Sequence, residues 1–357
     1  MGLILSLWNE NRAKVNKWYR KPLDRCISGN GKPYSISLKK GTVNKLLVTF
    51  LGGGASWSEE TARTPISMRS IITMKQGYYL EHVPPVFLKM GHVGLLASGD
   101  KRNPFHDWFI LNIPYSTADF HIGCNDFNYK DDKGKERTLY HHGMKNVRSA
   151  LSVLKEFFGE TPETLVISGC SAGAFGCLAH VSEISDLYPD CENIIVYTEG
   201  AHLHSPLWNE IIRTVWKTES DLVTYIESDD LVFDFLRYAQ DNTPSHTRFL
   251  YSVSVWDEAL VQFMSKMNHG EVAVSEQTLQ EFHETLIETV KKLKKNITNF
   301  SYYLTDFGKK KDGVTPHIFS GSPKLLYNKM QDDISLADWI SQGLDESPPD
   351  VGVKFIN

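Results

Sequence analysis

The stretch TLVISGCSAGAFGCLAHV, residues 164–181, carries the clearest structural signal in the chain. Its first residues are β-branched or apolar and predict a buried strand, whereas the small and apolar residues after Ser171 predict a helix. Between the two lies a Gly-x-Ser-x-Gly pattern that runs from Gly169 to Gly173. A serine at such a turn is either part of an ordinary turn or a nucleophile whose hydroxyl projects above a sheet.

The residue types around Ser171 favour a nucleophile. A tight strand-to-helix turn forces unusual backbone angles and close packing, so its neighbours must be small, as Gly169, Ala172 and Gly173 are. The N-terminus of the following helix supplies unpaired N–H groups and positive potential for a developing oxyanion. The bare pattern also arises by chance, so the prediction that Ser171 is catalytic depends on the strand and helix around it.

The rest of the chain alternates between strand and helix patterns. Apolar strand patterns occupy residues 44–54, 107–117, 163–169, 193–200, 248–257 and 300–306. Helical spacing of apolar residues marks 139–159, 172–188 and 277–295. Apolar strands separated by helices predict an α/β fold with a mostly parallel sheet and helices on both faces. Because no repeat or linker interrupts it, we expect one domain over 1–357, with 205–247 as a candidate cap or lid insertion.

A serine nucleophile needs an acid and a histidine, which follow it in that order on this type of scaffold. The strand pattern at 248–257 ends at Asp257, so we prefer Asp257 as the acid. Asp257 could also be a helix N-cap, and the two roles are compatible. Glu199 and Asp306 end strand-like runs too and are the alternatives.

Of thirteen histidines, only His269, His283 and His317 follow Asp257. His283 lies within an amphipathic helix pattern, and His269 lies in a turn-like segment. His317 lies in a loop shortly after the last strand, where the general base of such a triad is expected. We therefore predict His317 as the base, although a loop histidine is often only a surface residue.

The segment TFLGGGASW, residues 49–57, is the candidate for the second half of an oxyanion hole. Three consecutive glycines let the backbone approach a substrate and direct N–H groups at an oxygen. A phosphate-binding loop is the alternative, but no Lys-Ser/Thr pair follows, and the contiguous glycines do not form G-x-G-x-x-G.

Composition excludes several classes of function. The formal net charge is −5 and no basic stripe is present, so we expect no nucleic-acid partner. The five cysteines lack C-x-x-C spacing, and His202 and His204 have no obvious third partner, so no metal site is expected. A disulfide framework is not expected either, although a single bridge stays open. The opening apolar run is too short for a membrane span or a secretory segment, which favours the cytoplasm; the alternative is secretion with a signal sequence absent from this chain.

Several blocks in this order resemble the pectin acetylesterase family, which also contains the Notum carboxylesterases. The resemblance covers roughly residues 42–330. Its blocks are FLGGGASW (50–57), NPFHDWFILNIPYSTADFHIG (103–123), ISGCSAGAFG (167–176), SVWD (254–257) and TPHIF (315–319).

The resemblance implies serine esterase chemistry on an α/β-hydrolase-like fold, without metal or organic cofactor. Matched by motif, the triad is Ser171, Asp257 and His317. The oxyanion hole would be built from the backbone at the end of the glycine loop and after the serine: Gly53, Gly54, Ala55 and Ala172.

Four further residues are candidates for substrate contact. Asp119 and His121 match a family block and would either position the glycine loop or contact substrate. Trp57 and Tyr115 could stack on a sugar or form the floor of an acyl pocket, and ordinary packing explains them equally well.

The chain departs from the family pattern at three positions. Family members usually have cysteine where Ser56 and Ser116 stand, and a second glycine where Ala174 stands. These differences leave the triad intact but weigh against an extracellular location and a pectin substrate.

The predicted function is that of a serine carboxylesterase that hydrolyses a small-molecule or carbohydrate ester, with a short acyl or acetyl group. The alternatives are a depolymerase or peptidase with the same triad, a lipid deacylase, and an inactive glycan- or lipid-binding homologue. The sequence does not indicate the oligomeric state.

Overall fold

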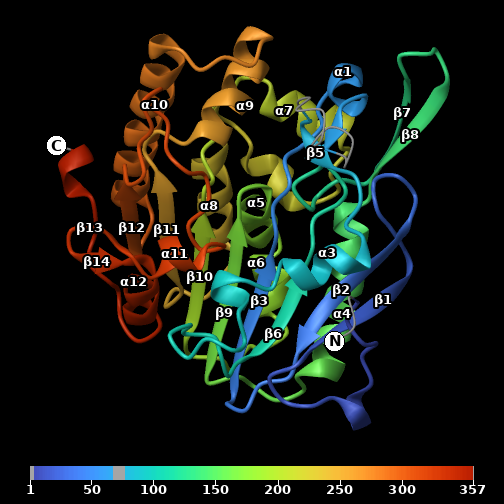
Figure 1. Ribbon diagram of the computed structural model, residues 1–357, viewed down its shortest axis with the longest axis vertical. Helices are drawn as coiled ribbons and strands as arrows, with labels where there is room; N and C mark the ends of the chain where they lie inside the picture. Colours follow the sequence, from blue (N-terminus) through green and yellow to red (C-terminus); the bar gives the residue numbers. More distant parts are fainter. Residues whose placement is uncertain (1–3, 67–76, 357) are drawn as a thin grey trace.

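The computed structural model describes residues 4–66 and 77–356. Its centre is an eight-stranded sheet in the order β1-β2-β6-β3-β9-β10-β11-β12 (Figure 1). In that order the strands are β1 (Trp18–Ile27), β2 (Pro33–Lys39), β6 (Phe109–Ile113), β3 (Lys45–Phe50), β9 (Thr164–Cys170), β10 (Ile194–Glu199), β11 (Arg248–Ser254) and β12 (Phe300–Thr305). The pairs β1–β2 and β2–β6 are antiparallel, and every later pair is parallel. The predicted α/β class with a mostly parallel sheet is confirmed.

Both faces of the parallel part of the sheet are buried, and alternate residues of each strand point to opposite faces. In β3, Leu46 and Val48 pack in the larger hydrophobic cluster, whereas Leu47 packs in a second cluster across the sheet. The larger cluster includes apolar residues of helices α4, α5, α8, α9 and α10. The second cluster includes residues of α11 and α12. This division explains why the strands read as continuous apolar runs in the sequence.

The helices lie mainly between consecutive strands of the chain. The longer helices are α4 (Gly143–Phe157), α5 (Ala172–Ala179), α8 (Leu231–Asp241), α9 (Glu258–His269), α10 (Glu276–Asn296) and α12 (Leu336–Gly343). The shorter ones are α1 (Glu59–Ala62), α3 (Pro85–Met90), α6 (Val181–Ser185), α7 (Trp208–Glu210) and α11 (Pro323–Leu326). Single helical turns are η1 (Glu10–Arg12), η2 (Gly94–Leu96), η3 (Ile211–Val215), η4 (Asp221–Tyr225) and η5 (Val353–Phe355).

Three small two-stranded sheets lie outside the central sheet. They are β4 (Pro65–Ile66) with β5 (Tyr79–Leu80), β7 (Asn125–Lys130) with β8 (Glu136–His141), and β13 (Lys329–Gln331) with β14 (Ile334–Ser335). The β7–β8 hairpin extends away from the body of the molecule (Figure 1).

The segment 205–247, the candidate cap or lid, contains α7, η3, η4 and α8. It packs into the larger hydrophobic cluster through Trp208, Trp216 and Phe235, each fully buried. Its role as a lid stays a prediction.

Candidate active site

Ser171 lies on the turn between β9 and α5, at the carboxyl end of the parallel strands. Its φ of 53° and ψ of −129° are strained for a residue with a side chain. A Cβ on Gly169 would lie 2.1 Å from the carbonyl oxygen of Gly173, and a Cβ on Gly173 would lie 2.2 Å from that of Phe50. Backbone atoms cannot yield at these distances, so both positions flanking Ser171 require glycine.

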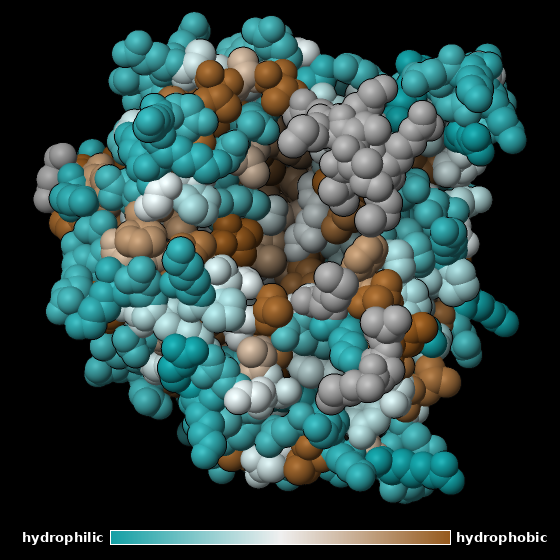
Figure 2. All heavy atoms as spheres, viewed as in Figure 1, coloured by the Kyte–Doolittle hydropathy of each residue, from teal (hydrophilic) through white to brown (hydrophobic). Residues whose placement is uncertain are grey.

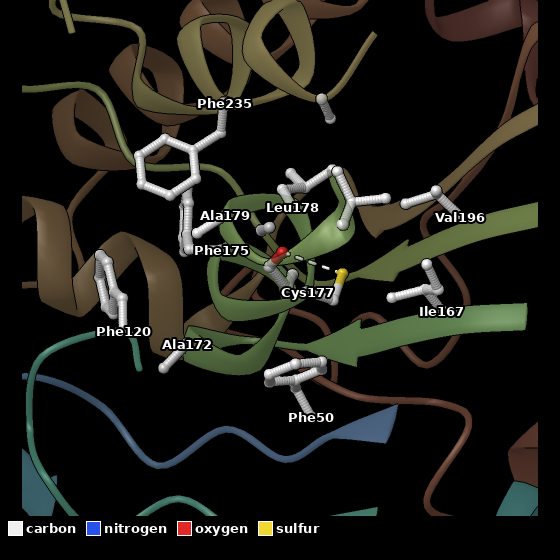
Figure 3. Close-up of a cluster of buried hydrophobic side chains, with 14 of the residues drawn as sticks. Phe50, Phe120, Ile167, Ala172, Phe175, Cys177, Leu178, Ala179, Val196 and Phe235 are labelled. Carbon is white, nitrogen blue, oxygen red and sulfur yellow. Dashed lines mark hydrogen bonds between the residues drawn. The ribbon is translucent and has the colours of Figure 1, made fainter. Parts of the chain in front are cut away.

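Helix α5 holds this turn in the core. Figure 3 shows Phe50, Ile167 and Val196 of the sheet around the helix, with Phe235 of α8 on another side of it. The rings of Phe175 on α5 and Phe235 meet edge to face at 5.3 Å between centroids. The turn that carries Ser171 is therefore supported by packing on several sides.

Asp257 and His317 come together across the carboxyl ends of β11 and β12. His317 Nδ1 lies 2.7 Å from Asp257 Oδ2, and the Asp257 side chain is fully buried. Because a carboxylate oxygen only accepts hydrogen bonds, this contact requires the proton on Nδ1 and leaves Nε2 unprotonated in the neutral ring. The other Asp257 oxygen accepts from the N–H of Leu260, so this residue is also the N-cap of α9.

Two features of the surroundings of His317 shift its pKa in opposite directions. Burial lowers the pKa of the imidazole, but the charge and hydrogen bond of Asp257, together with the charge of Glu199, outweigh it and raise the pKa above its ordinary value. The neighbouring carboxylates thus stabilise the imidazolium form, which is the form a general base reaches after it takes a proton.

Ser171 and His317 line the same cavity, whose volume is about 420 Å3. No hydrogen bond joins their side chains in the described part of the chain; such contacts are often long before substrate binds. The face shown in Figure 2 is hollowed near its centre, and hydrophobic residues border the hollow. The large apolar side chains of the cavity lining are those of Ile66, Leu80, Phe120, Phe175, Leu203, Leu260, Phe263 and Ile318.

The glycine loop forms another wall of this cavity. Gly52, Gly53, Gly54 and Ala172 all line it. A Cβ on Gly52 would lie 2.6 Å from the Cβ of Ser171, so the loop lies directly against the turn that carries Ser171. The N–H groups of Gly53 and Gly54 have no hydrogen-bond partner among residues 4–66 and 77–356 and remain available to a ligand oxygen.

Ala55 differs from these glycines. Its N–H donates to the carbonyl oxygen of Tyr78 at 3.0 Å, and its side chain is fully buried outside the lining. An N–H that donates to a backbone carbonyl is not free for an oxyanion, so the geometry does not support the predicted role of Ala55 as a donor.

Tyr115, Asp119 and His121 support the glycine loop from beneath. Their relative exposures are 1 %, 0 % and 2 %, so they offer almost no surface to a substrate. A Cβ on Gly53 would lie 2.7 Å from the Tyr115 ring, and His121 Nε2 lies 3.0 Å from the carbonyl oxygen of Leu51. Of the two roles considered from the sequence, the geometry favours positioning of the loop.

Asp119 is the centre of this support. One carboxylate oxygen accepts from the hydroxyl of Thr117 at 2.6 Å and the N–H of His121 at 3.1 Å, and the other accepts from the N–H of Gly143 at 2.8 Å. Burial raises its pKa to about 7 against the opposing effect of these donors. Phe120, between Asp119 and His121, has φ 52° and contributes its ring to the cavity wall.

Trp57 lies behind the cavity wall. Its ring centroid is 4.7 Å from that of Phe263 and 5.5 Å from that of Tyr78, and both of these residues line the cavity. The indole therefore supports the wall, and a direct contact of Trp57 with substrate stays a prediction.

The sequence interpretation missed most of the apolar lining. Phe175 lies in the expected helix at 172–188 and Leu203 in a segment without a predicted element, and apolar spacing does not tell a core residue from a cavity residue. It also named Glu199 only as an alternative acid, whereas its carboxylate is fully buried beneath the loop that carries His317.

In the described part of the chain, no three histidine, cysteine or acidic side chains gather in a way that could hold a metal ion. The five cysteines are all free. None of the described helices is long and apolar enough to cross a bilayer.

A model of the pectinacetylesterase family matches residues 25–216, which include the glycine loop and Ser171. The chain belongs to the pectinacetylesterase family. Asp257 and His317 lie beyond the matched part, so their assignment depends on geometry and on the motifs around them.

Two curated pectin acetylesterases from Arabidopsis thaliana have low sequence identity to this chain. Pectin acetylesterase 11 is 24 % identical over 179 residues, and Pectin acetylesterase 4 is 23 % identical over 180 residues. Each match covers 50 % of this chain and 42 % or 41 % of the relative. The chain thus matches less than half the length of these two relatives.

Two crystal forms of the Wnt deacylase Notum from Drosophila share the fold over nearly the whole chain. Each superposes with a TM-score of 0.60, covering 91 % of this chain and 92 % of the other, at 18 % and 16 % identity. At this identity the likeness establishes the α/β-hydrolase-like fold and nothing about the reaction.

Proposed function

We propose that this protein is a serine carboxylesterase whose triad is Ser171, Asp257 and His317. The observation that carries the proposal is the 2.7 Å contact between the buried Asp257 and the partly exposed His317, which lines the same cavity as the strained Ser171 turn. Membership of the pectinacetylesterase family supports ester hydrolysis as the reaction.

The proposed reaction is a two-step acyl transfer. The Ser171 hydroxyl oxygen bonds to the ester carbonyl carbon while its proton passes to His317 Nε2. N–H groups of Gly53, Gly54 and Ala172 stabilise the oxyanion. The carbon–oxygen bond to the alcohol then breaks, and the alcohol leaves with the proton from His317. Water then bonds to the acyl carbon as it gives a proton to the same nitrogen. The bond from that carbon to the Ser171 oxygen breaks, the proton returns from His317 to Ser171, and the acid leaves.

The lining of the cavity indicates the length and polarity of the acyl group. Its described residues include no Lys, Arg, Asp or Glu, and apolar side chains form much of its wall. The volume of about 420 Å3 falls within the roughly 300–1,000 Å3 typical of small-molecule sites. An acetyl group alone would leave much of this surface uncovered, so the cavity favours a longer, apolar acyl chain. This supports the lipid deacylase alternative over the acetyl ester that the sequence first suggested.

A series of p-nitrophenyl esters tests the proposal. Each buried methylene contributes about 0.8 kcal/mol, so we expect kcat/KM to rise about four-fold per methylene from acetate to butyrate and onward to octanoate until the cavity is full. The Ser171→Ala variant should lose about 10⁴-fold or more in kcat on every ester. Full activity of folded Ser171→Ala would refute the triad, and a preference for acetate would refute the acyl assignment alone.

Of the two expected compartments, the cytoplasm and the cell exterior, the family relationship favours secretion. Fractionation of the source cells with an antibody to the protein would decide between them.

A further inference from the structure

Glu199 is a buried carboxylate placed between the two halves of the proposed triad. It is the last residue of β10, the strand that pairs with β9 on one side and β11 on the other. Its relative exposure is 0 %. The proposed reaction gives it no contact with substrate, and its only role named so far is the small effect of its charge on the pKa of His317.

The main chain of Glu199 holds the nucleophile turn. Its carbonyl oxygen accepts the N–H of Ser171 at 2.8 Å. This bond extends the β9–β10 pairing one residue past the end of β9, to the strained residue itself. The position of Ser171 relative to β10 is therefore set by a backbone hydrogen bond.

The side chain of Glu199 holds the loop that carries His317. One carboxylate oxygen accepts from the N–H of Phe319 at 2.8 Å and the N–H of Ser320 at 3.0 Å, and the other accepts from the Ser320 hydroxyl. Three donors from two consecutive residues thus converge on one carboxylate, which fixes the chain two residues after His317.

The other end of the same loop is held separately. The N–H of Thr315 donates to the carbonyl oxygen of Trp256 at 2.9 Å, and the N–H of Glu258 donates to that of Thr315 at 3.2 Å. His317 therefore lies midway between two anchors, the backbone around Asp257 and the carboxylate of Glu199.

Gly200 lets the imidazole lie close to the end of β10. Its φ is 61°, and a Cβ there would lie 3.2 Å from His317 Cε1 and 2.8 Å from Ile318 Cδ1. The ring consequently packs against the backbone of the residue directly after Glu199.

We infer that Glu199 is a positioning residue that sets the distance between His317 and Ser171, holding the serine through its carbonyl oxygen and the histidine loop through its carboxylate. This inference rests on the proposed function of the triad. Asp257 orients the imidazole from one side; Glu199 fixes the loop from the other.

The test compares variants that change the length and the charge of the Glu199 side chain separately. Glu199→Gln keeps the length of the side chain and one carbonyl oxygen as acceptor, whereas Glu199→Asp keeps the charge but withdraws it by one methylene. We expect Glu199→Asp and Glu199→Ala to lower kcat on p-nitrophenyl butyrate at least ten-fold with KM changed less than about two-fold, and Glu199→Gln to recover most of the loss. The rate of fluorophosphonate labelling of Ser171 should fall in parallel.

Asp234 provides a matched control elsewhere in the fold. Its carboxylate accepts the N–H groups of Glu227 and Ser228 at 3.0 and 2.9 Å, and none of these three residues lines the cavity. Asp234→Ala should lower the melting temperature and leave kcat unchanged. If Glu199→Ala does not fold, the Glu199→Asp and Glu199→Gln variants still test the positioning role. Equal kcat in Glu199→Asp and wild type, or a greater loss in Glu199→Gln than in Glu199→Asp, would overturn the inference.

A crystal structure of Glu199→Asp separates this inference from the proposed function. We expect the 315–320 loop to shift so that His317 moves relative to Ser171. An unmoved loop would refute the positioning role even if the wild-type protein proved to have no esterase activity, and inactivity of the wild type would by itself refute only the proposed function.

Discussion

At the scale of single residues, Asp257 combines two duties that one substitution can separate. One oxygen caps α9 and the other holds the Nδ1–H of His317. Asparagine is as good an N-cap as aspartate, so the fold should tolerate the change, but the charge that stabilises the imidazolium is lost.

We therefore expect Asp257→Asn to lower kcat by about 10⁴-fold while the melting temperature stays close to that of the wild type. In the wild type, kcat/KM should fall as pH drops through the pKa of His317, which Asp257 and Glu199 raise above that of an ordinary imidazole, because the base must be neutral to accept a proton. Turnover and a thermal melt of Asp257→Asn test the first expectation, and a pH–rate profile of the wild type tests the second. Near-wild-type turnover in Asp257→Asn would contradict the assigned role.

The buried Asp119 predicts a pH dependence of stability. Its pKa rises from 3.8 to about 7 on folding, so between those values the unfolded chain ionises while the folded protein holds the proton. Folding stability from this group is thus greatest below about pH 4 and is lost as pH rises toward 7. The difference in free energy of unfolding between wild type and Asp119→Asn should accordingly shrink from pH 4 to pH 7, as urea titrations would show. A difference that grows with pH would mean the carboxylate is ionised in the fold.

At the scale of elements, the strand–turn–helix unit around Ser171 depends on the two glycines that flank it. An alanine at 173 would place a methyl group 2.2 Å from the Phe50 carbonyl oxygen, where β3 passes beneath α5. We expect Gly173→Ala to cost about 1–3 kcal/mol in the free energy of unfolding and to lower activity by displacing the turn. Gly99→Ala is the matched control, because nothing lies within 4 Å of its added Cβ. Equal urea midpoints for the two variants would count against this packing.

Sequence patterns located the six parallel strands, because strands buried on both faces are continuously apolar. They missed β1 and β2, whose polar and apolar residues mix at the antiparallel edge of the sheet. The helix expected at 139–159 begins at Gly143, because 136–141 pairs with β7 as a strand. The helix expected at 172–188 is broken at His180, whose ring contacts the carbonyl oxygen of His121 at 2.9 Å. Each miss involves a partner distant in sequence.

At the scale of the whole molecule, the cavity joins segments from many parts of the chain, and the proposed function places the acyl group in it. Ala259, exposed on α9, belongs to its lining. Ala259→Trp should obstruct the space for the chain and lower kcat/KM for p-nitrophenyl octanoate about ten-fold more than for acetate, equivalent to the loss of one or two buried methylenes. Ala259→Ser, which adds one small atom, is the control. Parallel losses on both esters in Ala259→Trp would show that the cavity does not hold the acyl chain.

The sequence by itself determined the α/β class, the nucleophile candidate and the order of acid and histidine, because burial on both sheet faces and a tight turn at Ser171 constrain residue type locally. Only the tertiary structure decided that Asp257 lies 2.7 Å from His317, that Asp119 and His121 are buried beneath the glycine loop, and that Glu199 binds the loop after the histidine. These contacts form where the carboxyl ends of parallel strands meet, and each joins residues whose spacing along the chain carries no periodic signal. Apolar side chains likewise have the same pattern in a core and in a cavity wall, so the shape of the cavity appears only when the elements pack together.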